Sequence, residues 1–251
     1  MMFRKQERKI GDYTVASRIG GGRYGVCFLA HDPLGRKVVL KRFRRRMWKK
    51  NRADNHHEAV VLSGLCHPGV PELLGVINAR KGYYFVLGYK EGNTLEKWLF
   101  KEKKVFTAQD VYRIGTQLFE ILEYVHGRNV VHGDISIANV VDDGEQVSLI
   151  DFGLARYAGG ERQIFRLDYA RTANVIIYLL YSGYTGNGRR PWHEELPLTP
   201  PQRAFLLGLM NPGTENRENG SEETYDAAQI RRQFQECFGE DAESRGGRKR
   251  H

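Results

Sequence analysis

The sequence predicts an α+β protein in which a sheet-rich N-terminal part precedes a mainly helical C-terminal part. Up to residue 88, short runs of alternating apolar and polar residues are separated by glycine and proline, a pattern typical of antiparallel strands. From Thr94 onward, apolar residues recur every three or four positions, as on one face of an amphipathic helix. The chain has 251 residues, of which 41% are hydrophobic and 27% charged, so it can form a sizeable core. We expect four regions in order: a polar lead-in over residues 1–12, a first lobe over 13–88, a second lobe over 89–239, and a basic, disordered tail over 240–251.

The first lobe is expected to contain a small antiparallel sheet and one helix. Its third strand follows a turn at Asp32-Pro33-Leu34-Gly35, residue types that favour tight turns. The helix places Val61, Leu62 and Leu65 on one face and ends before Pro68. The expected strands are 13–19, 25–31, 36–43, 72–78 and 83–89, and the expected helix is 53–65.

The second lobe is expected to be built from helices. Thr107 can cap a long helix whose apolar positions keep a 3.6-residue period: Val111, Ile114, Leu118, Ile121, Leu122 and Val125. The other expected helices are a short one around Leu95, Trp98 and Leu99, a very apolar one over 168–183, one that starts after Thr199, and one over 225–238.

Composition excludes several classes of protein. No apolar run approaches the roughly 20 residues that span a bilayer, and the charged N-terminus has no apolar segment behind it, so we expect neither a membrane span nor a secretory signal. Three widely spaced cysteines argue against a disulfide framework and favour a cytoplasmic location. The net charge is +9, and residues 1–52 contain 16 Lys/Arg against 3 Asp/Glu, an excess of 16 − 3 = 13. This basic face and the tail could attract an acidic partner or RNA, but a solvated basic surface is the favoured explanation.

A glycine cluster lies between the first two expected strands. It reads Gly20-Gly21-Gly22-Arg23-Tyr24-Gly25-Val26. A dinucleotide-binding fold would place such a cluster between a strand and a helix, so this context favours a loop that covers phosphates. Taken alone, a plain glycine-rich hairpin would explain the cluster.

Lys41 lies in the middle of the third expected strand, directly after Val38, Val39 and Leu40. A lysine in an apolar strand needs a partner for its ammonium. Glu58, on the following helix, shares a face with Leu62 and Leu65, so it faces the same side as the core residues. The alternative is an exposed lysine and an unrelated glutamate.

The most informative stretch runs from His132 to Gly153. It contains His132-Gly133-Asp134, then Asn139, then Asp151-Phe152-Gly153. Such an array suits placing one carboxylate beside an acceptor hydroxyl while a second carboxylate and an amide hold magnesium on a nucleotide.

These motifs resemble the catalytic core of the protein-kinase-like superfamily, His-x-Asp-x-x-x-x-Asn followed by Asp-Phe-Gly, and the match covers residues 20–153. The resemblance implies a two-lobed fold, ATP as the phosphate donor and Mg²⁺ as the metal. It makes Asp134 the catalytic base, Asn139 and Asp151 the metal ligands, and Lys41 the phosphate-binding lysine, whose expected partner is Glu58. It also implies that Asp168 anchors the backbone of the catalytic loop and that His132 packs under Phe152. The implied nucleotide contacts are Ile19, Gly20, Gly21, Gly22, Gly25, Val26, Val39, Lys41, Glu58 and Leu87, with the hinge-like residues Gly88, Tyr89 and Lys90 beside the adenine.

Three departures from the family pattern qualify the resemblance. Gly133 replaces the arginine that pairs with a phosphorylated activation loop, and Ser136 replaces the lysine that contacts the transferred phosphate. His-Gly-Asp is similar to aminoglycoside- and choline-type phosphotransferases, and the serine is similar to RIO-type kinases. The run from Asp151 to Asp168 is short, has no Ala-Pro-Glu motif and contains no serine or threonine. We therefore expect a constitutively assembled site without a peptide platform of the usual kind.

Three functions remain open. The leading interpretation is an ATP-dependent Ser/Thr protein kinase that acts on a protein of unknown identity. The runner-up is a phosphotransferase for a small hydroxyl compound. The third is a pseudokinase scaffold that binds nucleotide or RNA; the presence of Lys41, Glu58, Asp134, Asn139 and Asp151 together argues against it.

Overall fold

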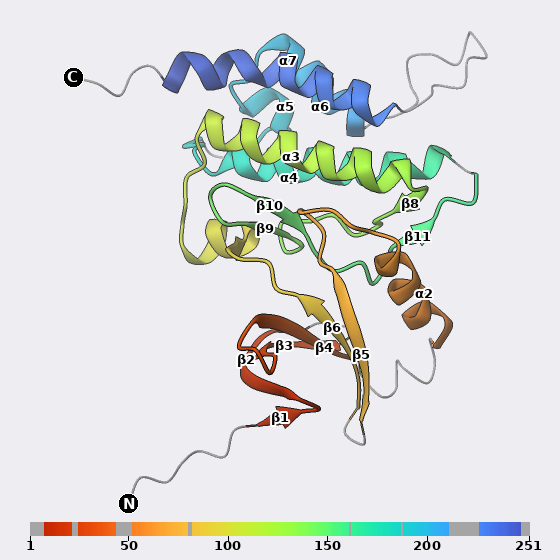
Figure 1. Ribbon diagram of the computed structural model, residues 1–251. Helices are drawn as coiled ribbons and strands as arrows, with labels where there is room; N and C mark the ends of the chain where they lie inside the picture. Colours follow the sequence, from red (N-terminus) through yellow and green to blue (C-terminus); the bar gives the residue numbers. More distant parts are fainter. Residues whose placement is uncertain are drawn as a thin grey trace, which may run out of the picture. The chain divides into compact units, whose positions relative to one another are not determined.

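The computed structural model divides into two compact units, Met1–Lys90 and Glu91–His251 (Figure 1). It describes residues 8–21, 25–43, 52–79, 82–160, 162–186, 188–210 and 226–246, without the side chains of 52–57, 162 and 240–246. Gly22 of the glycine cluster, the basic run 44–50, the expected loop 212–223 and the last five residues of the tail lie outside these ranges. Within the described residues, the first unit is a sheet with one helix and the second is mainly helical, so the expected α+β architecture is confirmed.

The first unit contains a six-stranded antiparallel sheet in the order β1-β2-β3-β4-β6-β5. All five expected strands are present, and a two-residue strand, too short to give a sequence pattern, is added at the N-terminal end. Ile10 of this strand is buried with Phe28, Leu40 and Val86 in the core of the sheet. The strands are β1 (Lys9–Ile10), β2 (Tyr13–Gly21), β3 (Gly25–His31), β4 (Lys37–Phe43), β5 (Leu73–Ala79) and β6 (Gly82–Gly88).

The helix of the first unit, α2, spans Arg52–Ser63 and ends two residues before the expected position. Val61, Leu62 and Leu65 are buried as expected, at 0%, 2% and 5% exposure. The apolar face predicted from the sequence is therefore the packed face.

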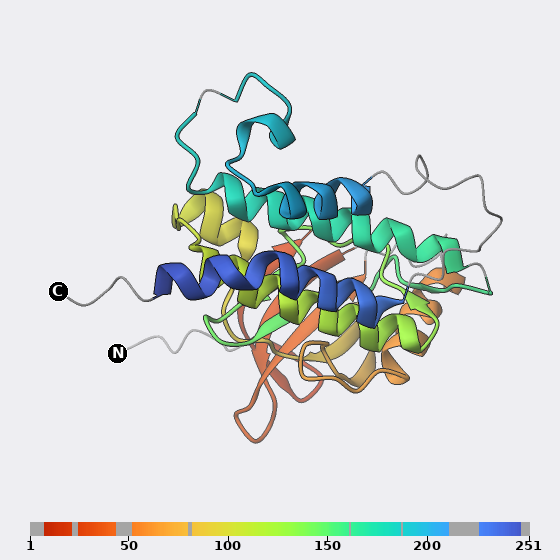
Figure 2. The same ribbon diagram turned by 90° about the horizontal axis from the view of Figure 1, so that it is seen from above.

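In the second unit, α3 (Ala108–Gly127) packs against α7 (Ala227–Gly246) and α4 (Arg166–Tyr181) (Figure 2). Gly115 permits the close approach of α3 and α7, because a Cβ there would lie 2.2 Å from Cζ of Phe234. Two small sheets, β10-β9-β7 and β11-β8, complete the unit. The remaining elements are β7 (Asn93–Thr94), η1 (Lys97–Lys101), β8 (Val130–Val131), β9 (Val140–Asp142), β10 (Val147–Leu149), β11 (Arg156–Tyr157), η2 (Arg162–Phe165), α5 (Trp192–Glu195) and α6 (Pro200–Met210).

Helix α3 begins and packs as the sequence predicts. The Thr107 hydroxyl accepts a hydrogen bond from the Asp110 N–H while the Asp110 side chain accepts from the Thr107 N–H, which together form a capping box. All six apolar positions expected to face the core are buried. Hydrophobic period and cap together were sufficient to define this helix.

Three helical expectations need correction. The short helix around Trp98 is a π-helical turn, Lys97–Lys101. Helix α4 starts and ends two residues before the expected range of 168–183. Helix α7 continues to Gly246 rather than ending at Phe238, so residues 240–246 are helical and the expectation of disorder from residue 240 is wrong for them. The strong helix formers Glu240, Ala242 and Glu243 follow Gly239, and they outweigh the helix-breaking tendency of one glycine. Within the described ranges, no helix is both long enough and apolar enough to cross a membrane.

Candidate active site

The hairpin β9–β10 brings Asn139 and Asp151 to the same end. Val140 pairs with Leu149 in its antiparallel ladder, and the Ile150 N–H donates to the Asn139 carbonyl at 2.8 Å. Asp151 follows immediately and is exposed, with a φ of 64° that is uncommon for a residue other than glycine. A short-range pairing therefore places the two predicted metal ligands next to each other.

Asn139 also contacts the predicted base. Its Nδ2 donates to the Asp134 carbonyl at 2.8 Å and to Asp134 Oδ2 at 3.0 Å. No described residue donates a hydrogen bond to the amide oxygen of Asn139, which is the atom that a cation would bind.

The residues present fit a magnesium ion. Mg²⁺ prefers oxygen ligands and is commonly held by one or two carboxylates together with substrate phosphates, rather than by a complete protein cage. The open amide oxygen of Asn139 and the exposed carboxylate of Asp151 match that pattern. Among the described residues there is no cluster of three or more His, Cys, Asp or Glu suited to a metal.

His132 has a structural position. Its ring meets that of Phe152 edge-on at a centroid distance of 4.6 Å, as expected. Nδ1 accepts from the Asp134 N–H at 3.2 Å and Nε2 lies 3.2 Å from the Ile150 carbonyl, so the neutral Nε2–H form satisfies both nitrogens. Burial lowers the pKa of His132, which favours this neutral form. The histidine thus links the loop before Asp134 to the segment before Asp151.

Asp168, in the first turn of α4, anchors the same loop from inside the unit. Its carboxylate accepts from the N–H groups of His132 at 2.7 Å and Gly133 at 2.8 Å, and His126 Nε2 lies 3.0 Å away. Burial by itself would raise the pKa of Asp168, but the hydrogen bonds from His126 and Gly133 hold it below its usual value. Gly133 has a φ of 75°, and a Cβ there would lie 2.9 Å from the Leu154 carbonyl oxygen. Glycine at 133 therefore suits the backbone of this loop.

Arg171, one turn further along α4, contacts Asp134 itself. Its Nη1 donates to Asp134 Oδ1 at 3.0 Å, and the two side chains are 34% and 40% exposed. With Asn139 on Oδ2, each oxygen of the predicted base has a donor.

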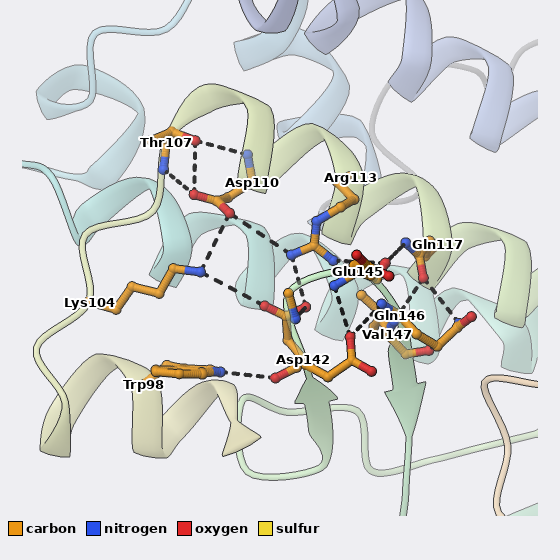
Figure 3. A network of polar contacts seen from close by, with 12 residues as sticks. Trp98, Lys104, Thr107, Asp110, Arg113, Gln117, Asp142, Glu145, Gln146 and Val147 are labelled. Carbon is orange, nitrogen blue, oxygen red and sulfur yellow. Dashed lines mark hydrogen bonds and ion pairs between the residues drawn. The ribbon is translucent and has the colours of Figure 1, made fainter. Parts of the chain in front are cut away.

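A buried carboxylate fastens the hairpin to the start of α3 (Figure 3). Asp142 is fully buried at the end of β9, and Arg113 Nη2 lies 2.8 Å from its Oδ1. Within the described part of the chain neither Arg113 Nη2 nor Asp142 Oδ2 has an aligned hydrogen bond, so this contact acts mainly through charge. Trp98 Nε1 donates to the Asp142 carbonyl at 3.1 Å and Lys104 Nζ lies 4.0 Å from Oδ2. These contacts hold the strand that directly follows Asn139.

The first unit contains the predicted lysine–glutamate contact. Lys41 on β4 is 4% exposed, and its Nζ lies 2.6 Å from Oε1 of Glu58 on α2. Glu58 is 3% exposed, so this ion pair is almost dry. The kinase resemblance implied this pair, and the spacing of Lys41 from the glycine loop and the core-facing position of Glu58 supported it.

The glycine loop closes the β2–β3 hairpin, where Gly20 pairs with Cys27 and Gly21 with Val26. Gly25 serves packing within the sheet, because a Cβ there would lie 2.3 Å from the Arg42 carbonyl oxygen. Gly20 is more open, since among the described residues a Cβ there would meet only Cβ of Cys27, at 4.0 Å. Phosphate contact therefore stays a prediction for Gly20 and Gly21.

The residues predicted to surround the adenine differ in exposure. Ile19 is 48% exposed and Leu87 8%, while Val26 and Val39 are half-buried. The Gly88 N–H already donates to the Glu72 carbonyl at 2.9 Å, and Lys90 Nζ donates to the Pro68 carbonyl at 2.5 Å. Tyr89 lies under Lys37, whose Nζ is 5.3 Å from its ring centroid. Backbone groups of Tyr89 and Lys90 are thus better suited to the predicted adenine contacts than the N–H of Gly88.

Four residues with a part in this arrangement carry no motif: His126, Arg113, Asp142 and Arg171. The available signal for His126 was a histidine on the apolar face of its helix, beside Leu122 and Val125, and the signal for Asp142 was an aspartate directly after two valines. Arg171 gives no such signal, because one arginine in a helix reads as a surface residue.

Comparisons with known proteins agree with this geometry. The family model for the protein kinase domain matches residues 13–176. The probable serine/threonine-protein kinase YbdM of Bacillus subtilis is 30% identical over 219 residues, which cover 83% of this chain and 86% of that protein. Two larger proteins are matched over a small part of their length. Discoidin domain-containing receptor tyrosine kinase B of Caenorhabditis elegans is 36% identical over 56% of this chain and 17% of that protein, and the mouse (Mus musculus) hormonally up-regulated neu tumor-associated kinase is 29% identical over 62% and 22%. The resemblance seen in the sequence is confirmed: this chain belongs to the protein kinase domain family.

Proposed function

We propose that this kinase transfers the γ-phosphate of ATP to a serine or threonine hydroxyl of a protein. The observation that carries the proposal is the arrangement around Asp134. Asn139 holds this carboxylate through its amide nitrogen and keeps its amide oxygen open for a cation. The side chain of Asn139 therefore holds the proton acceptor through its nitrogen and can bind the metal through its oxygen. Phosphoryl transfer to a hydroxyl uses both functions side by side.

In the proposed reaction the acceptor oxygen forms a bond to the γ-phosphorus while the bond from that phosphorus to the bridging oxygen breaks. The hydroxyl proton passes to the Asp134 carboxylate, and ADP leaves with the bridging oxygen and its electron pair. Lys41, held by Glu58, binds ATP phosphates, and the glycine loop covers them. Asn139 and Asp151 would hold Mg²⁺, which when bound neutralises phosphate charge.

Two observations favour a protein as the acceptor. The glycine loop and the hinge-like segment resemble those of protein kinases, and a relative matched over 83% of this chain is named a probable serine/threonine-protein kinase. A small hydroxyl compound is the second candidate. It is favoured by the short run after Asp151, where only β11 and η2 precede α4. The wide cysteine spacing supports the cytoplasm as the location.

We also propose that the site needs no phosphorylation of the run 152–167. This run has no serine or threonine, and Gly133 has no side chain to receive a phosphate. Mass spectrometry of active protein should find it unmodified. A phosphate on Tyr157 that activity requires would contradict this.

Incubation of the purified chain with magnesium, radiolabelled ATP and a generic basic protein tests the function. Asp134→Asn should reduce transfer about 10²–10⁴-fold, because it removes the proton acceptor. Lys41→Met, which removes the phosphate-binding ammonium, should abolish measurable transfer. Glu123→Gln is the matched control, since Glu123 is a 37% exposed carboxylate paired with Arg231 at 2.8 Å. ATP binding without transfer or hydrolysis would favour a scaffold, and transfer only to a metabolite extract would favour the second candidate.

A further inference from the structure

The segment that carries Asp134, Asn139 and Asp151 has no positive side chain of its own. Between Arg128 and Arg156 there is no lysine or arginine, but there are five carboxylates: Asp134, Asp142, Asp143, Glu145 and Asp151. The positive charge beside these carboxylates must come from elsewhere in the unit.

Within the described residues of this unit, Lys104 lies 4.0 Å from Asp142, and two arginines from helices make the closer contacts. Arg113 of α3 lies 2.8 Å from the buried Asp142, and Arg171 of α4 lies 3.0 Å from Asp134. The first contact is in the interior of the fold. The second is half-exposed and involves the side chain to which we assign proton transfer.

We propose that Arg171 is the positioning residue for the catalytic base. It acts on Asp134 from a helix rather than from the catalytic loop, where Ser136 supplies no charge. This inference rests on the proposed function and extends it to a residue that belongs to none of the motifs.

The geometry allows Arg171 to orient Asp134 without blocking it. A carboxylate can accept about four hydrogen bonds, and the described contacts use one on each oxygen, from Asn139 and Arg171. Donors on both oxygens restrain rotation of the carboxylate, while the remaining lone pairs can face an acceptor hydroxyl. The 40% exposure of the Asp134 side chain keeps it accessible.

Helix α4 provides a rigid base for this contact. Asp168 and Arg171 are three residues apart, so they lie on one face of the helix. Asp168 is fully buried and binds the loop backbone, which fixes the position of the helix turn from which Arg171 extends. The loop is therefore held both at its backbone and at its reactive side chain.

The test compares Arg171→Ala with Arg171→Lys and with Arg231→Ala. Arg231 is a matched control, because its 2.8 Å pair with Glu123 has 31% and 37% exposure, against 34% and 40% for Arg171 and Asp134. Label transfer to the basic protein, binding of a fluorescent ATP analogue and the melting temperature are measured for each variant. We expect Arg171→Ala to lower kcat about 10–100-fold, as misplacement of a catalytic group does, with unchanged ATP-analogue affinity and melting temperature.

Two further results distinguish positioning from a structural role. Arg171→Lys should recover part of kcat, because lysine keeps the charge but not the fixed donor geometry. Guanidinium ion at non-denaturing concentration should raise the kcat of Arg171→Ala but not that of Asp134→Asn.

Retention of half or more of the wild-type kcat by Arg171→Ala overturns the inference, and so does an increase. A fall in kcat that parallels a fall in melting temperature also overturns it. If the wild-type chain transfers no label to any acceptor, the proposed function fails and this inference fails with it; if only the Arg171 results disagree, this inference alone fails.

Discussion

Helix α4 holds the loop around Asp134 at two points with opposite surroundings. Asp168 is fully buried and receives hydrogen bonds from two backbone N–H groups and from His126. Arg171 is about one-third exposed and makes a single described contact, to the carboxylate of Asp134. The two residues share one helix face, but Asp168 acts through buried hydrogen bonds to the loop backbone and Arg171 through a partly exposed ion pair with a side chain.

This difference in burial predicts that the Asp168 contacts contribute mainly to stability and the Arg171 contact mainly to catalysis. Removing one partner of a buried, hydrogen-bonded charge pair costs about 3–5 kcal/mol of stability, because the remaining partner stays buried and has neither its partner nor water to interact with. An exposed ion pair contributes about 0–1 kcal/mol, because solvent replaces the lost partner. We therefore expect Asp168 variants to lose stability and Arg171 variants to lose activity.

Asp168→Asn gives the largest expected effect on stability. It removes the charge and turns one oxygen into an amide that faces N–H donors. We expect the free energy of unfolding in urea to fall by about 3–5 kcal/mol, a large part of the stability of a typical domain. Glu120→Gln, which changes an exposed carboxylate on α3, should leave it unchanged. A loss below 1 kcal/mol for Asp168→Asn would remove the distinction between the two contacts.

Lys41→Met tests the same rule in the first unit, where the ion pair is also dry. The substitution removes the ammonium 2.6 Å from the buried Glu58. We expect a loss of about 3 kcal/mol in unfolding free energy, less than for Asp168, which receives three hydrogen bonds. The double variant Lys41→Met/Glu58→Leu should recover much of that stability without recovering transfer. Equal stability of the single and double variants would show that the carboxylate is not penalised by burial.

Sequence alone identified the parts of the site that lie within one continuous stretch. Asp134, Asn139 and Asp151 come together through a hairpin, and Thr107 and the apolar period define α3, so local order was sufficient. The Lys41–Glu58 contact joins residues 17 positions apart, and it was implied by the kinase resemblance, with strand register and helix face in support.

The contacts that the sequence did not reveal join residues far apart in the chain. Arg171 is 37 residues from Asp134, and His126 is 42 residues from Asp168. No helix or strand period links residues this far apart, and both contacts form only because of the way the helices of the second unit pack. Gly25 shows another limit, because a glycine that suits phosphate binding also suits close packing against β4, and only the coordinates show the packing.

Lowering the pH should reduce the free energy of unfolding in two steps, first through His132 and then through Asp168. The pKa of His132 is lowered in the folded chain, so the unfolded chain binds the extra proton first, and stability falls as the pH decreases below about 6.5. The pKa of Asp168 is also lowered, so its contribution is present above about 4 and is lost as the pH falls further, through its folded pKa. Urea unfolding at several pH values should show a slope of up to about 1.4 kcal/mol per pH unit from the histidine.

His132→Phe isolates the histidine in that profile. The variant lacks the titrating ring, so its unfolding free energy should change less between pH 6.5 and 5 than that of the wild type, whatever its value at pH 7. Identical slopes would mean that other groups cause the pH dependence.

The smallest effect concerns a half-exposed contact with no part in the site. Thr107→Ala removes the cap of α3 and should cost about 1 kcal/mol in unfolding free energy, whereas Thr107→Ser keeps the hydroxyl and should cost less. Neither variant should change kcat. The result gives a reference value for Arg171, because both residues make solvent-accessible hydrogen bonds in the same unit, exposed at Thr107 and part-buried at Arg171. If Thr107→Ala lowered kcat as much as Arg171→Ala does, the exposed contact at Asp134 would have no special role, and its effect would reflect general loosening of the helical unit.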